Sequence, residues 1–381
     1  MRIGLDGLPL NQPLTGVGYY TLELARALAE DSPDSQFNII SPRPYVFENP
    51  ARDGLPPNIK LVRARTNLLT RRWWSIGLPR YLAKHPVDVF HGTNFEVPLW
   101  SNGRCATVIT IHDLSLFLHP RTHQARNVRR ARRRLPRMAD AATLIITPTK
   151  SVRDEVCELL RIARERVFAV PEAARQVFRP MPAVEATIIR KRLGIGDDFL
   201  LFVGTIEPRK GLQTLLRAFE QIAEGNKTLQ LVMAGQRGWL AQELLKEISE
   251  STFADRIKLT GYLNDEELRA LYSSCRIFVY PSIYEGFGLP PLEAMACGAP
   301  VIVSCIASVV EVCAEAALLI EPKSVSSLII GINKLLDDQN LRSQLIAAGR
   351  RQAAQTSWSR TAELTQAVYE EAMKRFREQH A

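Results

Sequence analysis

The chain has 381 residues, 46% hydrophobic and 23% charged, which is typical of a globular protein and excludes a disordered or fibrous one. This length exceeds what one hydrophobic core usually supports, so two domains are expected. The net charge is +9, and residues 1–180 carry 27 Lys and Arg against 16 acids. The basic first half favours an anionic partner: a membrane surface, a phosphorylated substrate or nucleic acid.

The six cysteines form no Cys-x-x-Cys pair, and no histidine is spaced to complete a zinc site. Several of them lie in apolar runs, where cysteine acts as a small hydrophobe, so we expect a reducing cytoplasm and no metal. The apolar runs are too short to span a bilayer, and any membrane contact is therefore expected to be peripheral.

Short apolar runs alternate with helical stretches along the whole chain. The strands expected in the first half are residues 2–6, 37–41, 59–64, 87–92, 106–113 and 143–149. Those expected in the second half are residues 199–205, 229–235, 257–262, 277–282, 300–304 and 317–321. This order predicts an α/β protein with parallel sheets covered on both faces. The proline-rich segment 170–186 indicates a linker, so two doubly wound, Rossmann-like domains should join near residue 175.

Ligands of doubly wound sheets bind at the carboxyl ends of the strands, so the loops that follow strands are the candidate sites. After the first strand, Gly16 and Gly18 precede a helix and allow close approach of an anion or a sugar to the backbone. His112 follows a later strand and could hydrogen-bond a sugar hydroxyl or be a structural histidine. His91 has the same placement after its own strand.

Basic and aromatic residues cluster in the first half. Trp73 and Trp74 follow two arginines, and residues 121–137 hold eight arginines and no acid, Arg129, Arg130 and Arg133 among them. This composition suits the headgroup region of an anionic bilayer, where a lipid-linked acceptor would lie. The alternatives are a solvated helix face or nucleic-acid binding, although no recognition fold accompanies the run.

Two loops of the second half carry charge. Arg209 and Lys210 follow a strand and precede a helix, where two cations could neutralise a diphosphate without a metal. In residues 279–304, Glu285 and Glu293 flank a glycine-rich turn whose helix begins with two prolines. Carboxylates accept hydrogen bonds from hydroxyl pairs, and helix amides favour a phosphate, so the turn suits a nucleotide sugar. We place Glu293 in the first turn of that helix, where it could instead complement the dipole.

The Glu-x7-Glu segment "EGFGLPPLEAMACGAPVIVS" resembles the signature of family-4 retaining glycosyltransferases of the GT-B fold. "TGVGYYT", "TIHDLS", "VGTIEPRKGL", "LVMAGQRGW" and "LTGYLNDEELRALYSSC" occur in the family's order and extend the resemblance over nearly the whole chain. It implies two Rossmann-like domains that face a central cleft: an acceptor-side domain, 1–175, onto which 357–381 cross back, and a donor-binding domain, 176–356.

The resemblance also implies roles for individual residues. Glu285 would contact the donor sugar and Glu293 the ribose, while Arg209 and Lys210 would meet the diphosphate and His112 the transferred sugar. The remaining donor contacts would be Gly16, Gly18, Thr205, Gly261, Tyr262, Gly286, Phe287, Gly288 and Leu289. Thr205 stands where some relatives have arginine, so Arg209 should carry more of the phosphate contact. Gly211 stands where many relatives have asparagine.

The implied reaction transfers a hexose from a nucleotide sugar, of the GDP-mannose or UDP-glucose type, to a hydroxyl of a lipid-linked or oligosaccharide acceptor. Retention, a metal-free site and a place in surface-polysaccharide or lipopolysaccharide assembly at the inner face of the cytoplasmic membrane are expected. Alternatives are an epimerase or phosphorylase of the same fold, or a basic nucleic-acid-binding protein. Nucleic acid is not expected as a partner.

Overall fold

The computed structural model describes residues 1–12, 14–45, 54–67, 70–99 and 104–380. Contacts between residues divide the chain into two compact units. Unit 1 consists of Met1–Leu114, Arg129–Glu172 and Ser357–Ala381, and unit 2 consists of Ser115–Val128 and Ala173–Thr356. Residues 115–128 therefore group with unit 2, whereas all of 1–175 are expected in the first domain.

Unit 1 is built on a parallel sheet of seven described strands in the order β3-β2-β1-β4-β5-β6-β7. The strands are β1 (Arg2–Asp6), β2 (Gln36–Ser41), β3 (Ile59–Arg63), β4 (Val89–Gly92), β5 (Ala106–Thr110), β6 (Leu144–Thr147) and β7 (Val167–Ala169). Six of them match predicted runs. The exception is β7, a strand of three residues at the sheet edge.

Four described helices of unit 1 lie between these strands in the chain, and a fifth follows unit 2. They are α1 (Gly16–Asp31), α2 (Leu78–Lys84), α4 (Ala125–Ala141, of which residues 129–141 belong to this unit), α5 (Lys150–Leu160) and α14 (Trp358–His380). The terminal helix α14 packs against α1 and against the strands β4, β5 and β6. Its Tyr369 hydroxyl lies 2.7 Å from Nδ1 of His91 on β4, so the last segment of the chain is fixed to the first sheet.

Unit 2 contains a second parallel sheet, of six described strands in the order β10-β9-β8-β11-β12-β13. The strands are β8 (Phe199–Val203), β9 (Gln230–Ala234), β10 (Ile257–Gly261), β11 (Ile277–Tyr280), β12 (Val301–Ser304) and β13 (Leu318–Ile320). Every residue of β8, β11 and β12 is buried, as expected for strands covered on both faces. The predicted fold class, two doubly wound parallel-sheet domains, is confirmed.

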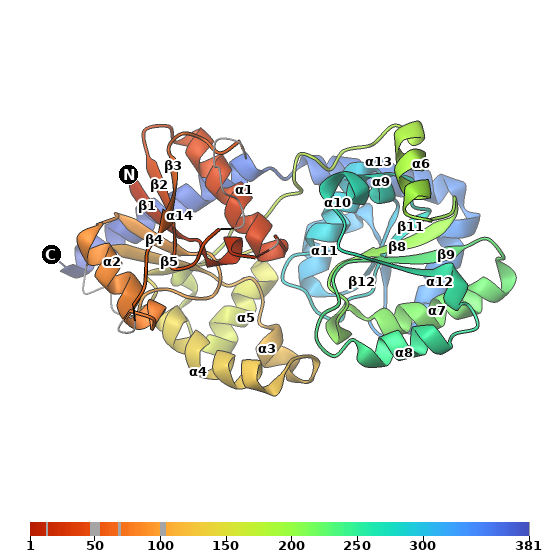
Figure 1. Cartoon of the computed structure of the whole chain (residues 1–381), viewed down its shortest axis with the longest axis horizontal. Helices are drawn as coiled ribbons and strands as arrows, with labels where there is room; N and C mark the ends of the chain where they lie inside the picture. The colour runs from red at the N-terminus through yellow and green to blue at the C-terminus, as the bar shows by residue number, and fades with distance from the viewer. Residues whose placement is uncertain (13, 46–53, 68–69, 100–103, 381) are drawn as a thin grey trace. The chain divides into compact units, whose positions relative to one another are not determined.

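In unit 2, α7 and α8 cover one face of the sheet, and α9 and α10 cover the other (Figure 1). The helices are α3 (Ser115–Leu118), α6 (Ala183–Arg192), α7 (Leu212–Gly225), α8 (Gln242–Glu250), α9 (Asp265–Ser274), α10 (Leu289–Cys297), α11 (Ala307–Cys313), α12 (Val325–Asp337) and α13 (Gln339–Ala354). A capping box formed by Asn264 and Glu267 begins α9. Among the described helices, none combines the length and apolar character needed to cross a membrane.

Candidate active site

The candidate site of unit 2 lies where its sheet changes direction. The neighbouring strands β8 and β11 pair with each other, and from them the chain continues outward on opposite sides, to β9 and to β12. The loops that leave these two strands therefore diverge and leave a crevice at their carboxyl ends. One loop, residues 204–211, carries Arg209 and Lys210, and the other, residues 281–288, carries Glu285.

The structure brings these three charged residues into direct contact. Lys210 Nζ donates to Glu285 Oε1 at 2.6 Å, and Arg209 Nη1 donates to Glu285 Oε2 at 2.9 Å. The side chains are almost buried, since 8% of Glu285, 9% of Lys210 and 12% of Arg209 is exposed. Both carboxylate oxygens are fixed by cations, and a carboxylate has lone pairs for about four hydrogen bonds in all.

Electrostatics determine the ionisation of this cluster. Burial alone would raise the pKa of Glu285, but the adjacent charges of Arg209 and Lys210 outweigh it and hold the pKa at about 2. Burial lowers the pKa of Lys210, and the negative charge of Glu285 opposes that shift. Glu285 is thus a carboxylate at neutral pH, which can accept hydrogen bonds but cannot donate a proton.

Two further residues of the cluster escape the sequence analysis. Glu207 Oε1 lies 2.9 Å from Arg209 Nη2, and the Tyr280 hydroxyl accepts from Lys210 Nζ at 3.0 Å. Burial raises the pKa of Glu207, against the opposing charge of Arg209. Glu207 lies in the same "EPRK" motif as the two cations, and this closeness in sequence is the feature that marks it as a residue of the cluster. Tyr280 reads as an ordinary strand residue, because only the pairing of β8 with β11 places it beside Lys210.

The backbone conformation at position 211 favours glycine, which the sequence alone does not reveal. Its φ is +67°, in the left-handed region, and a Cβ atom at this position would lie 2.1 Å from the carbonyl oxygen of Pro281. The loop after β8 therefore packs directly against the loop after β11. This packing holds Arg209 and Lys210 beside Glu285.

The loop that follows Glu285 ends at Gly288, where φ is +106° and α10 begins. The Ser308 hydroxyl at the start of α11 donates to the Glu285 carbonyl at 2.5 Å, and this hydrogen bond helps to fix the loop. Pro290 and Pro291 occupy the second and third helix positions, so among the first three residues of α10 only Leu289 carries an amide N–H. At the start of α10, the backbone N–H groups expected to bind a phosphate are therefore those of Leu289 and of the loop that precedes it.

The prediction for Glu293 is wrong in one respect. Glu293 is the fifth residue of α10 and lies beyond the first turn, which contains no acid, so it does not cap the helix dipole. Its carboxylate accepts from the Tyr272 hydroxyl at 3.1 Å and lies 3.9 Å from Arg175 Nε. Burial raises the pKa of Glu293 to about 7, and the opposing charge of Arg175 only partly compensates. Arg175 is itself fixed by a bidentate contact with Asp265.

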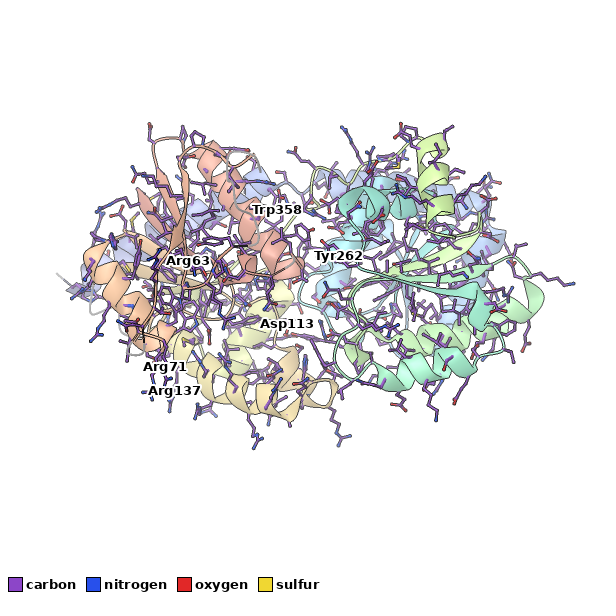
Figure 2. The ribbon with its side chains drawn as sticks, in the orientation of Figure 1. Arg63, Arg71, Asp113, Arg137, Tyr262 and Trp358 are labelled. Carbon is purple, nitrogen blue, oxygen red and sulfur yellow. The ribbon has the colours of Figure 1, made fainter. Side chains whose placement is uncertain are left out.

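Glycines close the neighbouring strand ends. Gly204, after β8, and Gly235, after β9, have φ values of +152° and +146°, and a Cβ at Gly235 would lie 2.0 Å from the Gly204 carbonyl. Gly261 accepts from the Gly235 amide at 2.8 Å. The next residue, Tyr262, is 49% exposed, and Thr205 is half-buried. Figure 2 labels Tyr262 in unit 2. These residues line the same sheet edge as Glu285.

In unit 1, Gly16 is the first residue of α1, and Gly18 is buried within it. A Cβ on Gly18 would lie 3.1 Å from the carbonyl oxygen of Pro9, so the helix lies close to that backbone. His112 follows β5, with Nε2 2.8 Å from the Thr93 carbonyl and Nδ1 3.2 Å from Glu172. Each ring nitrogen of His112 therefore faces an oxygen of unit 1.

The structure distinguishes the two histidines. His91 is completely buried between hydroxyls, with Nδ1 2.7 Å from Tyr369 and Nε2 2.7 Å from Thr110. Burial lowers the pKa of His91 to about 3, so the ring is neutral and structural. The His112 side chain keeps 12% of its surface exposed.

The residues expected at a membrane surface behave differently from one another. Trp73 and Trp74 are only 8% and 7% exposed, which corrects the expectation that their rings face a bilayer. The cause is a π-helical turn, residues 73–77, which buries both indoles within unit 1. Arg129, Arg130 and Arg133 are exposed on α4, and Arg130 Nη2 lies 3.5 Å from Glu96.

Comparison with known proteins identifies the family. Residues 14–173 match the family described as Glycosyltransferase Family 4, and residues 185–352 match Glycosyl transferases group 1. The chain is 32% identical to O-antigen chain mannosyltransferase B of Escherichia coli, over 94% of this chain and 96% of that one. It is 28% identical to MMP alpha-(1->4)-mannosyltransferase of Mycolicibacterium hassiacum, over 98% and 99% of the two chains.

The fold has counterparts among solved structures. Sucrose-phosphate synthase from Thermosynechococcus elongatus superposes with a TM-score of 0.76 and 22% sequence identity, over 97% of this chain and 98% of the synthase. This structural similarity shows the fold, whereas the two family matches and the 32% identical relative show which family the chain belongs to. The chain therefore belongs to family 4 of the glycosyltransferases and has the GT-B fold.

Proposed function

We propose that this glycosyltransferase moves a hexose from a nucleoside diphosphate sugar to an acceptor hydroxyl, with retention of the anomeric configuration. The preferred hexose is mannose. The observation that carries the proposal is Glu285, an ionised and almost buried carboxylate fixed between Arg209 and Lys210 at the switch point of unit 2. Two relatives that match nearly the whole chain are named mannosyltransferases, which favours mannose over glucose.

Glu285 binds the donor sugar and has no role in proton donation. A pKa of about 2 keeps it ionised, and a carboxylate has more lone pairs than the two cations occupy. Vicinal hydroxyls of a hexose supply such donors. Glu293, buried beside Tyr272, is proposed to hold the ribose, and His112 of unit 1 to contact the transferred sugar.

The diphosphate is the leaving group. In the proposed reaction, the bond from the anomeric carbon to the diphosphate oxygen breaks, and a bond to the acceptor oxygen forms on the same face. The acceptor proton passes to the departing diphosphate. The Lys210 ammonium and the backbone N–H groups of residues 287–289 stabilise the growing negative charge. Arg209 supports them by fixing Glu285 and Glu207, and no divalent cation is required.

The acceptor is proposed to be a growing surface glycan, with transfer at the inner face of the cytoplasmic membrane. Support comes from the name of the 32% identical relative, an O-antigen chain mannosyltransferase, and from the basic surface of unit 1. The peripheral attachment itself is an expectation of this proposal.

An assay of sugar transfer tests the proposal. The purified chain is incubated in EDTA with GDP-mannose or UDP-glucose and a nitrophenyl α-mannoside, and the product is examined by proton NMR. An α-mannoside product from GDP-mannose is expected. A β-linked product would overturn retention, dependence on added Mg²⁺ would overturn metal independence, and transfer from UDP-glucose alone would overturn the choice of mannose.

A further inference from the structure

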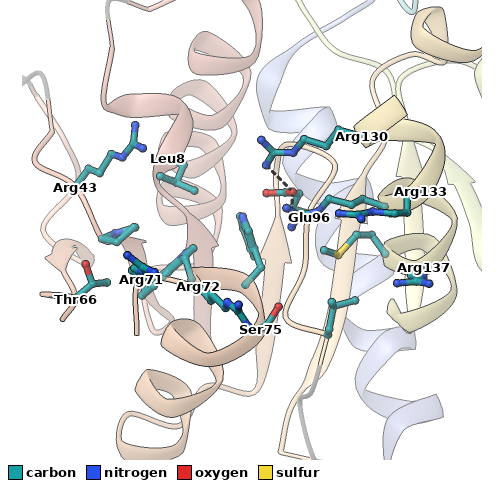
Figure 3. Close-up of a pocket in the computed structure, with 16 residues that line it drawn as sticks. Leu8, Arg43, Thr66, Arg71, Arg72, Ser75, Glu96, Arg130, Arg133 and Arg137 are labelled. Carbon is teal, nitrogen blue, oxygen red and sulfur yellow. Dashed lines mark ion pairs between the residues drawn. The ribbon is translucent and has the colours of Figure 1, made fainter. Parts of the chain in front are cut away.

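Unit 1 contains a cavity of about 850 Å³ that is separate from the residues of unit 2 described above. Arginine dominates its lining, which Figure 3 shows as two facing groups of side chains. Seven guanidinium groups line it, and Glu96 is its one acid among the described residues. The proposed sugar-transfer site of unit 2 uses none of them.

One wall is a single face of α4. Arg130, Arg133, Arg134 and Arg137 are spaced i, i+3, i+4 and i+7, which places all four side chains on the same side of a helix. The opposite face is anchored by the buried residue Leu135. Of the eight arginines in residues 121–137, only these four line the cavity.

The other wall comes from distant segments. Arg43 follows β2, and Arg71 and Arg72 precede the π-helical turn of residues 73–77. Figure 2 labels Arg71 and Arg137 in unit 1, and both line the cavity. A Cβ on Gly77 would lie 2.5 Å from the Thr70 carbonyl, so the turn closes tightly and holds the arginine pair in place. Turns of this kind are frequent at functional sites.

The charges in this cavity do not balance. Glu96 lies 2.7 Å from Arg134 and 3.5 Å from Arg130, and its side chain is 20% exposed. Within the described part of the chain, Arg71, Arg133 and Arg137 have no ion pair. Like charges gathered in one cavity repel one another, and a bound anion with several charges relieves that repulsion.

From these contacts we infer that the arginine cavity of unit 1 binds a ligand that carries a diphosphate group. Guanidinium forks match phosphate oxygens in bidentate pairs, and both walls of the cavity supply such forks. The recognised group is the diphosphate, whether inorganic or attached to a lipid. The inference rests on the proposed function in one respect, the assignment of a lipid-attached diphosphate to the acceptor.

Calorimetric titration of the full chain with inorganic pyrophosphate, at constant ionic strength, tests the site. The double variant Arg133→Gln, Arg137→Gln should bind about tenfold more weakly or worse, since it loses two charge-assisted contacts. The matched control, Arg80→Gln with Arg132→Gln, removes the same charge from exposed positions outside the cavity lining. Equal weakening in both doubles, or none in the first, would overturn the site.

Two further measurements sharpen the result. Glu96→Gln removes the one acid and should tighten pyrophosphate binding, a gain that misfolding cannot imitate. Farnesyl diphosphate should bind through the same arginines; tighter binding than pyrophosphate identifies a lipid source, and equal binding identifies the diphosphate alone as the recognised group. Pocket variants that leave farnesyl diphosphate binding unchanged would overturn the site.

Thermal stabilisation by GDP-mannose and UDP-glucose separates this inference from the proposed function. If neither sugar nucleotide stabilises the protein while pyrophosphate binding still depends on Arg133 and Arg137, the proposed function is rejected and the anion site is retained. Normal stabilisation by a sugar nucleotide, with pyrophosphate binding indifferent to these arginines, would reject the anion site alone.

Discussion

Lys210 Nζ lies 2.6 Å from Glu285 Oε1, although 75 residues separate them in the chain. The contact exists because β8 and β11 are neighbours in the sheet, and because Gly211 allows their two loops to touch. Removal of one partner from a buried lysine–glutamate pair leaves an uncompensated charge and is costly, so the contact fixes the carboxylate at the strand ends.

Replacement of Glu285 by glutamine should reduce sugar transfer on the order of 100-fold, because the amide holds the shape but removes the charge that orients the donor. Lys210 then loses its carboxylate partner, and the free energy of unfolding should fall by about 3 kcal/mol. Initial rates and urea denaturation measure the two effects. A folded Glu285→Gln variant with full activity would contradict the role of the carboxylate.

Much of the fold follows from the sequence alone. The buried runs that became β8, β11 and β12 stand out because parallel strands covered on both faces are continuously apolar. The missed strand, β7, has three residues and no such run. The burial of Trp73 and Trp74 was also missed, because a single π-helical turn decides which way the indoles point.

The candidate site was predictable residue by residue but not as a cluster. The spacing of Glu285 and Glu293 marks the turn, yet only strand order shows that Arg209 and Lys210 meet Glu285. Glu207 was overlooked, because an acid in a basic loop reads as ordinary surface. The arginine stripe of α4 was visible as a basic run, but the cavity it borders needs Arg71 and Arg72 from a separate segment.

Gly211→Ala should destabilise the protein by about 2 kcal/mol or more, because the residue has a positive φ and the new methyl group would meet the Pro281 carbonyl. Thermal or urea denaturation measures the loss. Gly225→Ala is the matched control, since Gly225 lies at the exposed end of α7 and a Cβ there meets nothing within 4 Å. Equal stability of the two variants would contradict the packing of the two loops.

Glu293 should make stability depend on pH. Its folded-state pKa of about 7 lies above the ordinary glutamate pKa of 4.5, so its protonated form stabilises the protein fully below pH 4.5, and that contribution is lost as the pH rises through 7. Glu293→Gln does not titrate. The stability of the variant relative to the wild type should therefore rise between pH 5 and pH 8 by up to about 3 kcal/mol.

Urea denaturation at these two pH values measures the Glu293 effect. Glu285→Gln is the control, because a pKa of about 2 means that the lost carboxylate contributes equally at pH 5 and pH 8. A stability difference between Glu293→Gln and the wild type that does not change with pH would contradict the buried, protonated state.

Tyr369→Phe should cost about 1–2 kcal/mol of stability, because it leaves Nδ1 of the fully buried His91 without its hydroxyl partner. The loss should appear in the unfolding of unit 1, where α14 packs on the sheet. A neutral Tyr369→Phe variant would contradict the structural role of His91.

The central claim, that Glu285 recognises the sugar of a nucleotide donor, is tested most directly by thermal shift in EDTA. The wild type should be stabilised more by GDP-mannose than by GDP at equal concentration, because only the former supplies sugar hydroxyls to Glu285. In Glu285→Gln this difference should vanish while stabilisation by GDP persists. A difference that survives the substitution would contradict the claim.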